Sequence, residues 1–167
     1  KRFAVRAAHL VDGRSATANV PSLGAQPSFY VLIQLYMFRE KLRIVEVMNE
    51  ATKGLSNDDL QRMADTIGRL PPPVPPVAAA DPARAAQAQA VIRQHRCDFC
   101  HKADFTGEQN VPRLAGQRED YLMQAMRAYK DDSRRGYDAA MADVMYPISD
   151  EQIRDELIDP RSDVYAC

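Results

Sequence analysis

The stretch Cys97-Asp98-Phe99-Cys100-His101 decides the fold that this sequence predicts. Two thiols at this spacing can add to the two vinyl groups of one haem, and the histidine that follows is then held beneath the iron as its fifth ligand. The motif therefore predicts covalently bound haem c, attached at Cys97 and Cys100, with His101 as a ligand of the iron.

Two other interpretations of the Cys-x-x-Cys pattern compete with haem attachment. A thioredoxin-like redox pair expects strands around the motif, and the sequence has no convincing alternating strand pattern. A zinc site needs further ligands, but besides His101 the chain offers only His9 and His95, and Cys167 is remote in sequence. We therefore keep the haem interpretation.

The sixth ligand of such an iron is a methionine or a second histidine. We choose Met141, with Met145 as the alternative, because Met141 lies seven residues before Ile148 just as Met48 lies seven residues before Leu55. A thioether ligand raises the reduction potential relative to a second histidine. It also fills the coordination sphere, which disfavours oxygen or peroxide chemistry.

The chain repeats itself with an offset of 91 residues. The segment V-P-S-L-G-A-Q at residues 20–26 matches V-P-R-L-A-G-Q at residues 111–117. Further pairs related by the same offset include Tyr30 with Tyr121 and Arg43 with Arg134. Shared helical propensity would not reproduce this order of residues, so duplication is the better explanation.

A proline-rich stretch separates the two halves. Successive prolines lack amide donors and favour an extended, semi-rigid conformation. We predict a first domain at residues 1–70, a linker at 71–80 and a second domain at 81–167. The alternative, a loop that lies on the surface of one domain, stays open.

Both halves are predicted to be helical. Apolar residues recur at helical spacing over residues 28–40 and 118–131, and a further helix is expected from residue 82 to about residue 96. Ser56 and Ser149 are expected N-caps, and the residue three positions after Ser149 completes a capping box there. The sequence therefore predicts an all-α fold.

Composition and charge exclude some classes of function. The net charge of -1 argues against nucleic-acid binding. We expect no transmembrane segment, because no apolar run approaches the ~20 residues that a membrane helix needs. Lys1-Arg2-Phe3 leads into no apolar core, so we expect no signal peptide and, if the protein is exported, its mature form or a fragment.

Taken together, these motifs resemble the two-domain dihaem class I cytochromes c over roughly residues 9–155. That family includes the c-four type and the dihaem subunit of flavocytochrome c sulfide dehydrogenases. The resemblance implies two tandem class I cytochrome c domains, joined by the proline-rich linker, that shuttle electrons in the bacterial periplasm. It also implies His/Met iron in each, held by His9 with Met48 and by His101 with Met141.

Supporting roles follow from the same resemblance. Pro21 and Pro112 are expected to orient the axial histidines through their carbonyl groups. Tyr30 and Tyr121, each in the helix that follows, are expected to pack near the haems.

The first half departs from the family pattern. Val5 and Ala8 stand where the family has the thioether cysteines before His9. This half has lost its haem and kept the fold, or it holds haem non-covalently, or the residues given near the N-terminus are not those of the natural chain. We favour the third explanation, because Met48 and the supporting residues are intact, and we predict two haems.

We expect an electron carrier that passes single electrons between a dehydrogenase or respiratory donor and an oxidase or other cytochrome, with no bond-making catalysis of its own. One alternative is a cytochrome subunit of a dehydrogenase complex, and a further one is a dedicated docking subunit with the haemless first half as its interaction module. Another is a dihaem peroxidase-like enzyme with one open iron. A methionine at the same position in both halves argues against the enzyme.

Overall fold

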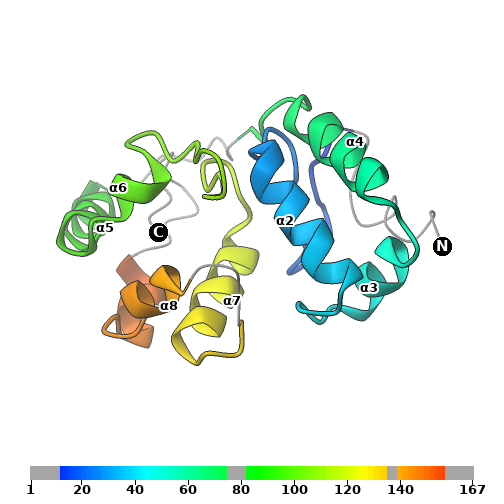
Figure 1. Cartoon of the computed structure of the whole chain (residues 1–167). Helices are drawn as coiled ribbons and strands as arrows, with labels where there is room; N and C mark the ends of the chain where they lie inside the picture. Colours follow the sequence, from blue (N-terminus) through cyan, green and yellow to red (C-terminus); the bar gives the residue numbers. More distant parts are fainter. Residues whose placement is uncertain (1–11, 75–81, 135–138, 157–167) are drawn as a thin grey trace.

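The computed structural model describes residues 12–74, 82–134 and 139–156, and within these ranges the chain forms helices and loops without a β-strand. The prediction of an all-α fold is confirmed for this part of the chain. Figure 1 shows two groups of helices side by side. The first group contains α2 (Ser28–Arg39), α3 (Glu46–Thr52) and α4 (Asn57–Gly68). The second contains α5 (Pro82–His95), α6 (Cys97–His101), α7 (Glu119–Lys130), α8 (Ala140–Met145) and the π-helical turn η1 (Gln152–Glu156).

The helix termini agree with their sequence signals. Ser149 accepts a hydrogen bond from the Gln152 N–H at 3.1 Å, and the Gln152 amide oxygen accepts one from the Ser149 N–H at 3.0 Å. Ser56 and Asp59 form the same reciprocal pair at the start of α4, at 3.1 and 2.9 Å. The sequence predicted a capping box only at Ser149, but the shorter carboxylate of Asp59 also reaches back to the N-cap.

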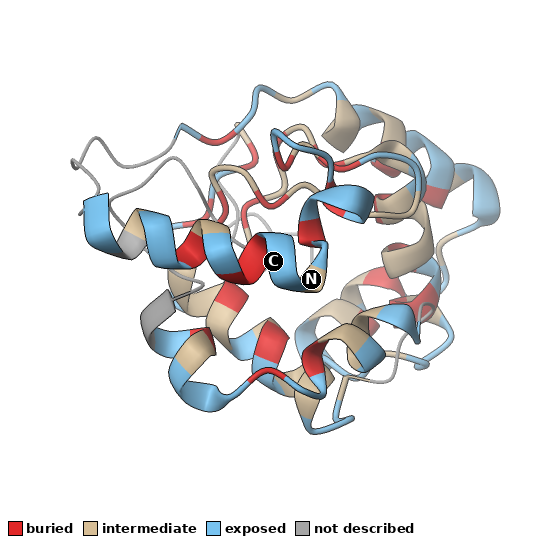
Figure 2. Cartoon of the chain, turned by 90° about the vertical axis from the view of Figure 1, so that its left-hand side faces the viewer, coloured by how far each residue is buried: buried red, intermediate tan, exposed pale blue. Residues whose placement is uncertain are grey.

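Each half has its own hydrophobic core. The core of the first half consists of Val31, Leu35, Leu60 and Ala64, where α2 packs against α4. The larger core of the second half joins α5, α7, α8 and η1. Its buried members are Ala88, Val91, Ile92, Cys97, Phe105, Leu114, Leu122, Met126, Met145, Ile148 and Ile153. Figure 2 shows buried residues in patches along helices and loops, with intermediate and exposed residues between them.

Pro73, in the proline-rich stretch, lies against the second half. Pro73 is buried, and its carbonyl oxygen would be 2.5 Å from a side-chain carbon added at Gly116. Gly116 also has φ +74, which favours glycine. These residues therefore pack closely on a loop of the second half, while residues 75–80 lie outside the described ranges. The domain boundaries stay a prediction.

Among the helices that the structure describes, none is both long and apolar enough to cross a bilayer.

Candidate functional site

The Cys-x-x-Cys-His motif forms the short helix α6. Arg96, at φ 55 and ψ 37, interrupts the chain between α5 and α6, so that the motif turns away from the longer helix. Cys97 and His101 are buried, whereas the Cys100 thiol is free and exposed.

The imidazole of His101 is held in one orientation. Its Nδ1 lies 3.0 Å from the carbonyl oxygen of Pro112. Because a carbonyl only accepts hydrogen bonds, Nδ1 carries the proton and Nε2 keeps a lone pair. Burial lowers the pKa of His101, only partly opposed by the bond to Pro112, and so favours the neutral ring. A neutral imidazole anchored at one nitrogen is the usual form of a metal-ligating histidine.

A glycine turn brings Pro112 to this histidine. Gly107 has φ +66, and its N–H donates to the His101 carbonyl at 3.1 Å. A side-chain carbon at Gly107 would lie 2.5 Å from the carbonyl carbon and oxygen of Pro112. The sequence reasoning did not single out Gly107, although its place between the motif and Pro112 was a usable signal.

The two candidate methionines of the second half differ in burial. Met145 is fully buried in the core of the second half, whereas Met141 is half-buried and packs against the edge of that core. The Met145 side chain is therefore occupied in packing, and the Met141 thioether is the more accessible of the two. Among the described residues, no group of three or more His, Cys, Asp or Glu side chains could hold a metal ion.

The first half supplies fewer described site residues. His9 lies outside the described ranges. Met48 is half-buried, and its backbone is held by two bonds of 2.8 Å, from its N–H to the Val45 carbonyl and from the Thr52 hydroxyl to its own carbonyl. Pro21 is half-buried in the loop before α2. Apolar side chains just before Met48 are exposed, namely Leu42, Ile44, Val45 and Val47.

Two glutamines join the halves through reciprocal hydrogen bonds. The amide of Gln117 accepts from the Ser22 N–H at 2.7 Å and donates to the Ser22 carbonyl at 2.9 Å. The amide of Gln26 accepts from the Arg113 N–H at 3.0 Å and donates to the Arg113 carbonyl at 2.9 Å. Both glutamine side chains are buried, so these bonds are sheltered from water. They position the loops that precede α2 and α7.

Tyr30 and Tyr121 lie at this interface. Each phenol oxygen is 3.4 Å from a guanidinium nitrogen of the opposite half, Tyr30 from Arg134 and Tyr121 from Arg43. The repeat had identified these four residues as two equivalent pairs, but it did not predict that the pairs cross between the halves.

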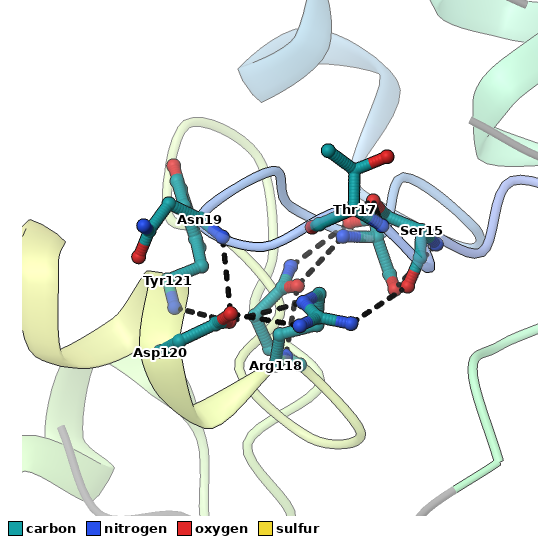
Figure 3. Close-up of polar contacts among 8 residues, drawn as sticks. Ser15, Thr17, Asn19, Arg118, Asp120 and Tyr121 are labelled. Carbon is teal, nitrogen blue, oxygen red and sulfur yellow. Dashed lines mark hydrogen bonds and ion pairs between the residues drawn. The ribbon is translucent and has the colours of Figure 1, made fainter. Parts of the chain in front are cut away.

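A further contact between the halves, which has no equivalent in the repeat, completes the interface, as Figure 3 shows. Arg118 donates to the Asp120 carboxylate at 2.7 and 3.0 Å and to the Ser15 carbonyl at 3.1 Å. The Asn19 N–H donates to the same carboxylate at 3.0 Å. The hydrogen bond from Arg118 is the main cause that lowers the pKa of Asp120. The first half has Pro27 and Phe29 at the positions equivalent to Arg118 and Asp120, so it cannot reproduce this contact.

Several curated proteins are similar to the chain in sequence, although no protein-family model matches it. Cytochrome c4 of Pseudomonas aeruginosa is 28% identical over 137 residues, which cover 77% of this chain and 67% of that protein. The thiosulfate dehydrogenase electron acceptor of Thiomonas intermedia is 29% identical over 127 residues, 71% of this chain and 58% of that protein. Cytochrome c-554(548) of Halomonas halodenitrificans is 39% identical over 61 residues, 35% of this chain and 74% of that protein.

The fold is similar to that of a solved cytochrome c4. The crystal structure of reduced recombinant cytochrome c4 from Pseudomonas stutzeri superposes with a TM-score of 0.79 at 25% identity, over 97% of this chain and 91% of that chain. Cytochrome c4 of Acidithiobacillus ferrooxidans gives a TM-score of 0.76 at 22% identity, over 93% of this chain and 95% of that one.

Proposed function

This chain belongs to the class I cytochromes c, and from that premise we propose that it passes single electrons in the bacterial periplasm, between a dehydrogenase or respiratory donor and an oxidase or other acceptor. That it is an electron-transfer protein with haem c agrees with its relatives named cytochrome c4. Those relatives are electron carriers rather than enzymes. The location and the individual partners belong to the proposal.

The anchored imidazole of His101 is the observation that supports this function most directly. Its Nδ1 is occupied by the Pro112 carbonyl at 3.0 Å, so Nε2 is the nitrogen left for iron. We propose that Cys97 and Cys100 would attach the haem and that His101 and Met141 would hold its iron. Bound haem supplies an iron that changes valence by one electron.

The protein's own residues set the conditions for that exchange. The Pro112 carbonyl fixes the ring of His101 and increases its basicity, which strengthens a bond from Nε2 to a metal. The apolar core around Cys97 excludes water from the buried side of the motif. Cys100 is exposed, so a haem attached there would be open on this side to a donor or acceptor.

We propose a second haem in the first half, with His9 and Met48 as its ligands and Pro21 and Tyr30 in supporting positions. The exposed apolar side chains before Met48 favour this, because a flat apolar cofactor would cover Leu42, Ile44, Val45 and Val47. The proposal keeps the domain boundaries predicted above, at residues 1–70, 71–80 and 81–167.

A cytochrome subunit of a dehydrogenase complex is the second candidate. It is favoured by the 29% identity to the thiosulfate dehydrogenase electron acceptor of Thiomonas intermedia. The chain covers only 58% of that protein. A thiosulfate dehydrogenase as electron donor is therefore a proposal for this chain. Native mass spectrometry of the protein purified from its source separates the candidates, since a subunit retains its dehydrogenase and a free carrier does not.

Two measurements test the haem assignment. Mass spectrometry of the denatured chain should show covalent haem at Cys97 and Cys100, and a pyridine haemochrome assay should give two haems per chain. One haem per chain would refute the proposed site at Met48 while leaving the second-half site standing. No covalent haem, or rapid peroxide turnover with carbon monoxide binding by the reduced protein, would refute the electron-carrier proposal.

A further inference from the structure

The helix that carries Met48 is held by polar rather than apolar side chains. This helix, α3, has seven residues, and a helix of this length is not stable by itself in water. Its buried residues are Asn49 and Thr52, both polar, whereas the apolar Val47 beside Met48 is exposed. Burial of apolar side chains therefore contributes little to the position of α3, so hydrogen bonds have to fix it.

The side-chain amide of Asn49 supplies three of these bonds. Its nitrogen donates to the Phe38 carbonyl at 2.7 Å and to the Arg43 carbonyl at 2.8 Å, and its oxygen accepts from the Val45 N–H at 2.8 Å. Both amide hydrogens are thus used, and Asn49 is only 7% exposed. One side chain therefore joins the last turn of α2, the loop that follows it and the start of α3.

A further hydrogen bond acts on Met48 itself. The Thr52 hydroxyl, which is buried, donates to the Met48 carbonyl at 2.8 Å. The Met48 N–H donates to the Val45 carbonyl at the same distance. The backbone of Met48 is therefore fixed on both sides, and Val45, which accepts its N–H, is itself tied to Asn49.

The second half holds its methionine helix differently. Aligned on Met48 and Met141, Asn49 is equivalent to Ala142 and Thr52 to Met145. Ala142 has no polar side chain, and Met145 is fully buried in the hydrophobic core of its half. Apolar packing thus does for α8 what hydrogen bonds do for α3. Because the repeated unit folds in the second half without an asparagine here, the fold by itself does not require Asn49.

We propose that Asn49 is a positioning residue, which fixes α3 so that the Met48 thioether is in place before an iron binds. The role toward the iron rests on the proposed function, in which His9 and Met48 are the ligands of the first haem. Buried hydrogen bonds around a ligand residue restrict its movement away from the metal. An external ligand should therefore compete poorly with Met48 for the same coordination position.

Competition by imidazole in the holoprotein measures how firmly Met48 is held. Imidazole binds ferric iron where the methionine has left, so its apparent affinity rises with the fraction of open sites. Asn49→Ala should raise the apparent affinity of the first-half haem at least about tenfold and weaken its Met–iron charge-transfer band. The second-half haem should not change, and Met48→Ala identifies which phase of the titration belongs to the first half.

Two variants separate positioning from a general loss of stability. Asn57→Ala removes an exposed hydrogen bond, which the Asn57 amide oxygen accepts from Arg39 at 2.9 Å. Leu60→Ala opens a cavity in the core of the first half. It should lower the thermal midpoint at least as much as Asn49→Ala, yet leave the imidazole affinity close to that of the wild type. If Asn49→Ala and Leu60→Ala gave equal imidazole affinities, Asn49 would be merely structural and the proposal would be overturned.

Hydrogen exchange distinguishes failure of this proposal from failure of the proposed haem site. One haem per chain would refute the site at Met48, and with it the role of Asn49 toward an iron. Exchange at the Val45 amide then decides whether Asn49 holds α3. Faster exchange in Asn49→Ala than in Asn57→Ala supports that contact, and equal rates overturn it as well. If Asn49→Ala does not fold, Asn49→Asp keeps the size and the acceptor but removes both donors, and the same comparisons apply.

Discussion

Gln117 binds the backbone of Ser22 in the same way as Gln26 binds the backbone of Arg113. The two contacts are images of each other under the 91-residue offset, since Ser22 is equivalent to Arg113 and Gln26 to Gln117. The same face of the duplicated unit therefore pairs with itself, as in the isologous contact of a symmetric dimer. The Arg43–Tyr121 and Arg134–Tyr30 contacts obey the same symmetry.

Replacing Gln117 by alanine should weaken the interface. The change leaves the N–H and the carbonyl of Ser22 without their partner in a buried place, which costs about 1–3 kcal/mol for each unsatisfied group. We expect a lower free energy of unfolding in chemical denaturation, and a similar loss for Gln26→Ala.

Gln61→Ala is the matched control for both glutamine variants. Gln61 also donates from its side-chain amide, to Asp65 at 2.9 Å, but that bond is exposed to solvent. Its replacement should change the free energy of unfolding little. If Gln117→Ala were no more destabilising than Gln61→Ala, the glutamine contacts would not hold the halves together.

The sequence predicted the features that depend on neighbouring residues. The capping signals at Ser56 and Ser149 follow from residues within one turn of a helix, and both caps are present. The repeat showed that Gln26 and Gln117 are equivalent, but not that each binds the opposite half. The similarity of the two repeats shows which positions are equivalent. A contact between the repeats depends instead on how segments about 90 residues apart pack against each other.

The choice between Met141 and Met145 shows how sequence and structure combine. Spacing alone favours Met141, because it reproduces the position of Met48 in the repeat. The full burial of Met145 supplies a physical reason for the same choice, since a core side chain cannot swing out to a metal without leaving a cavity. The sequence had no means of predicting this burial.

Met141→Ala should therefore open the iron of the second half. We expect loss of the Met–iron charge-transfer band at the red end of the ferric spectrum, a lower midpoint potential and carbon monoxide binding after reduction. The control is Met145→Leu, a swap of similar volume in the core that should cost less than about 1.5 kcal/mol and keep the band. Loss of the band in Met145→Leu with its retention in Met141→Ala would reverse the assignment.

Ser56→Ala should destabilise the protein in a pH-dependent way. Hydrogen bonds from the Ser56 hydroxyl, and next from its N–H, lower the pKa of Asp59 from 3.8 to about 2. A carboxyl whose pKa is lowered on folding stabilises the fold above its unfolded pKa, and that contribution disappears as the pH falls through the folded pKa. The cost of Ser56→Ala, about 1 kcal/mol for a lost N-cap, should be complete above pH ~4 and shrink towards pH ~2.

The second half provides the control for that pH dependence. Ser149 caps η1 with Gln152 as its partner, and an amide does not titrate. Ser149→Ala should cost a similar amount at every pH between about 2 and 7. Parallel pH profiles for the two variants, measured by urea denaturation, would show that Asp59 does not contribute through its charge.

Arg134→Gln should raise the pKa of Tyr121. Burial of this phenol opposes its ionisation, and Arg134 is the strongest of the influences that nevertheless lower its pKa to about 8. With Arg134 removed, only Arg43 counteracts burial, so the pKa moves up towards or beyond its usual value of 10.

The lowered pKa of Tyr121 makes the free energy of unfolding depend on pH. Because folding lowers the pKa of Tyr121, the wild type should gain stability as the pH rises from about 8 to about 10, and Arg134→Gln should lose that gain. NMR titration of ring-labelled tyrosine, with Tyr121→Phe to assign the signal, measures the pKa directly. Arg127→Gln is the control, because Arg127 is an exposed arginine on the same helix as Tyr121. An equal shift in Arg127→Gln would mean that Tyr121 responds to the net charge of the protein rather than to its contact with Arg134.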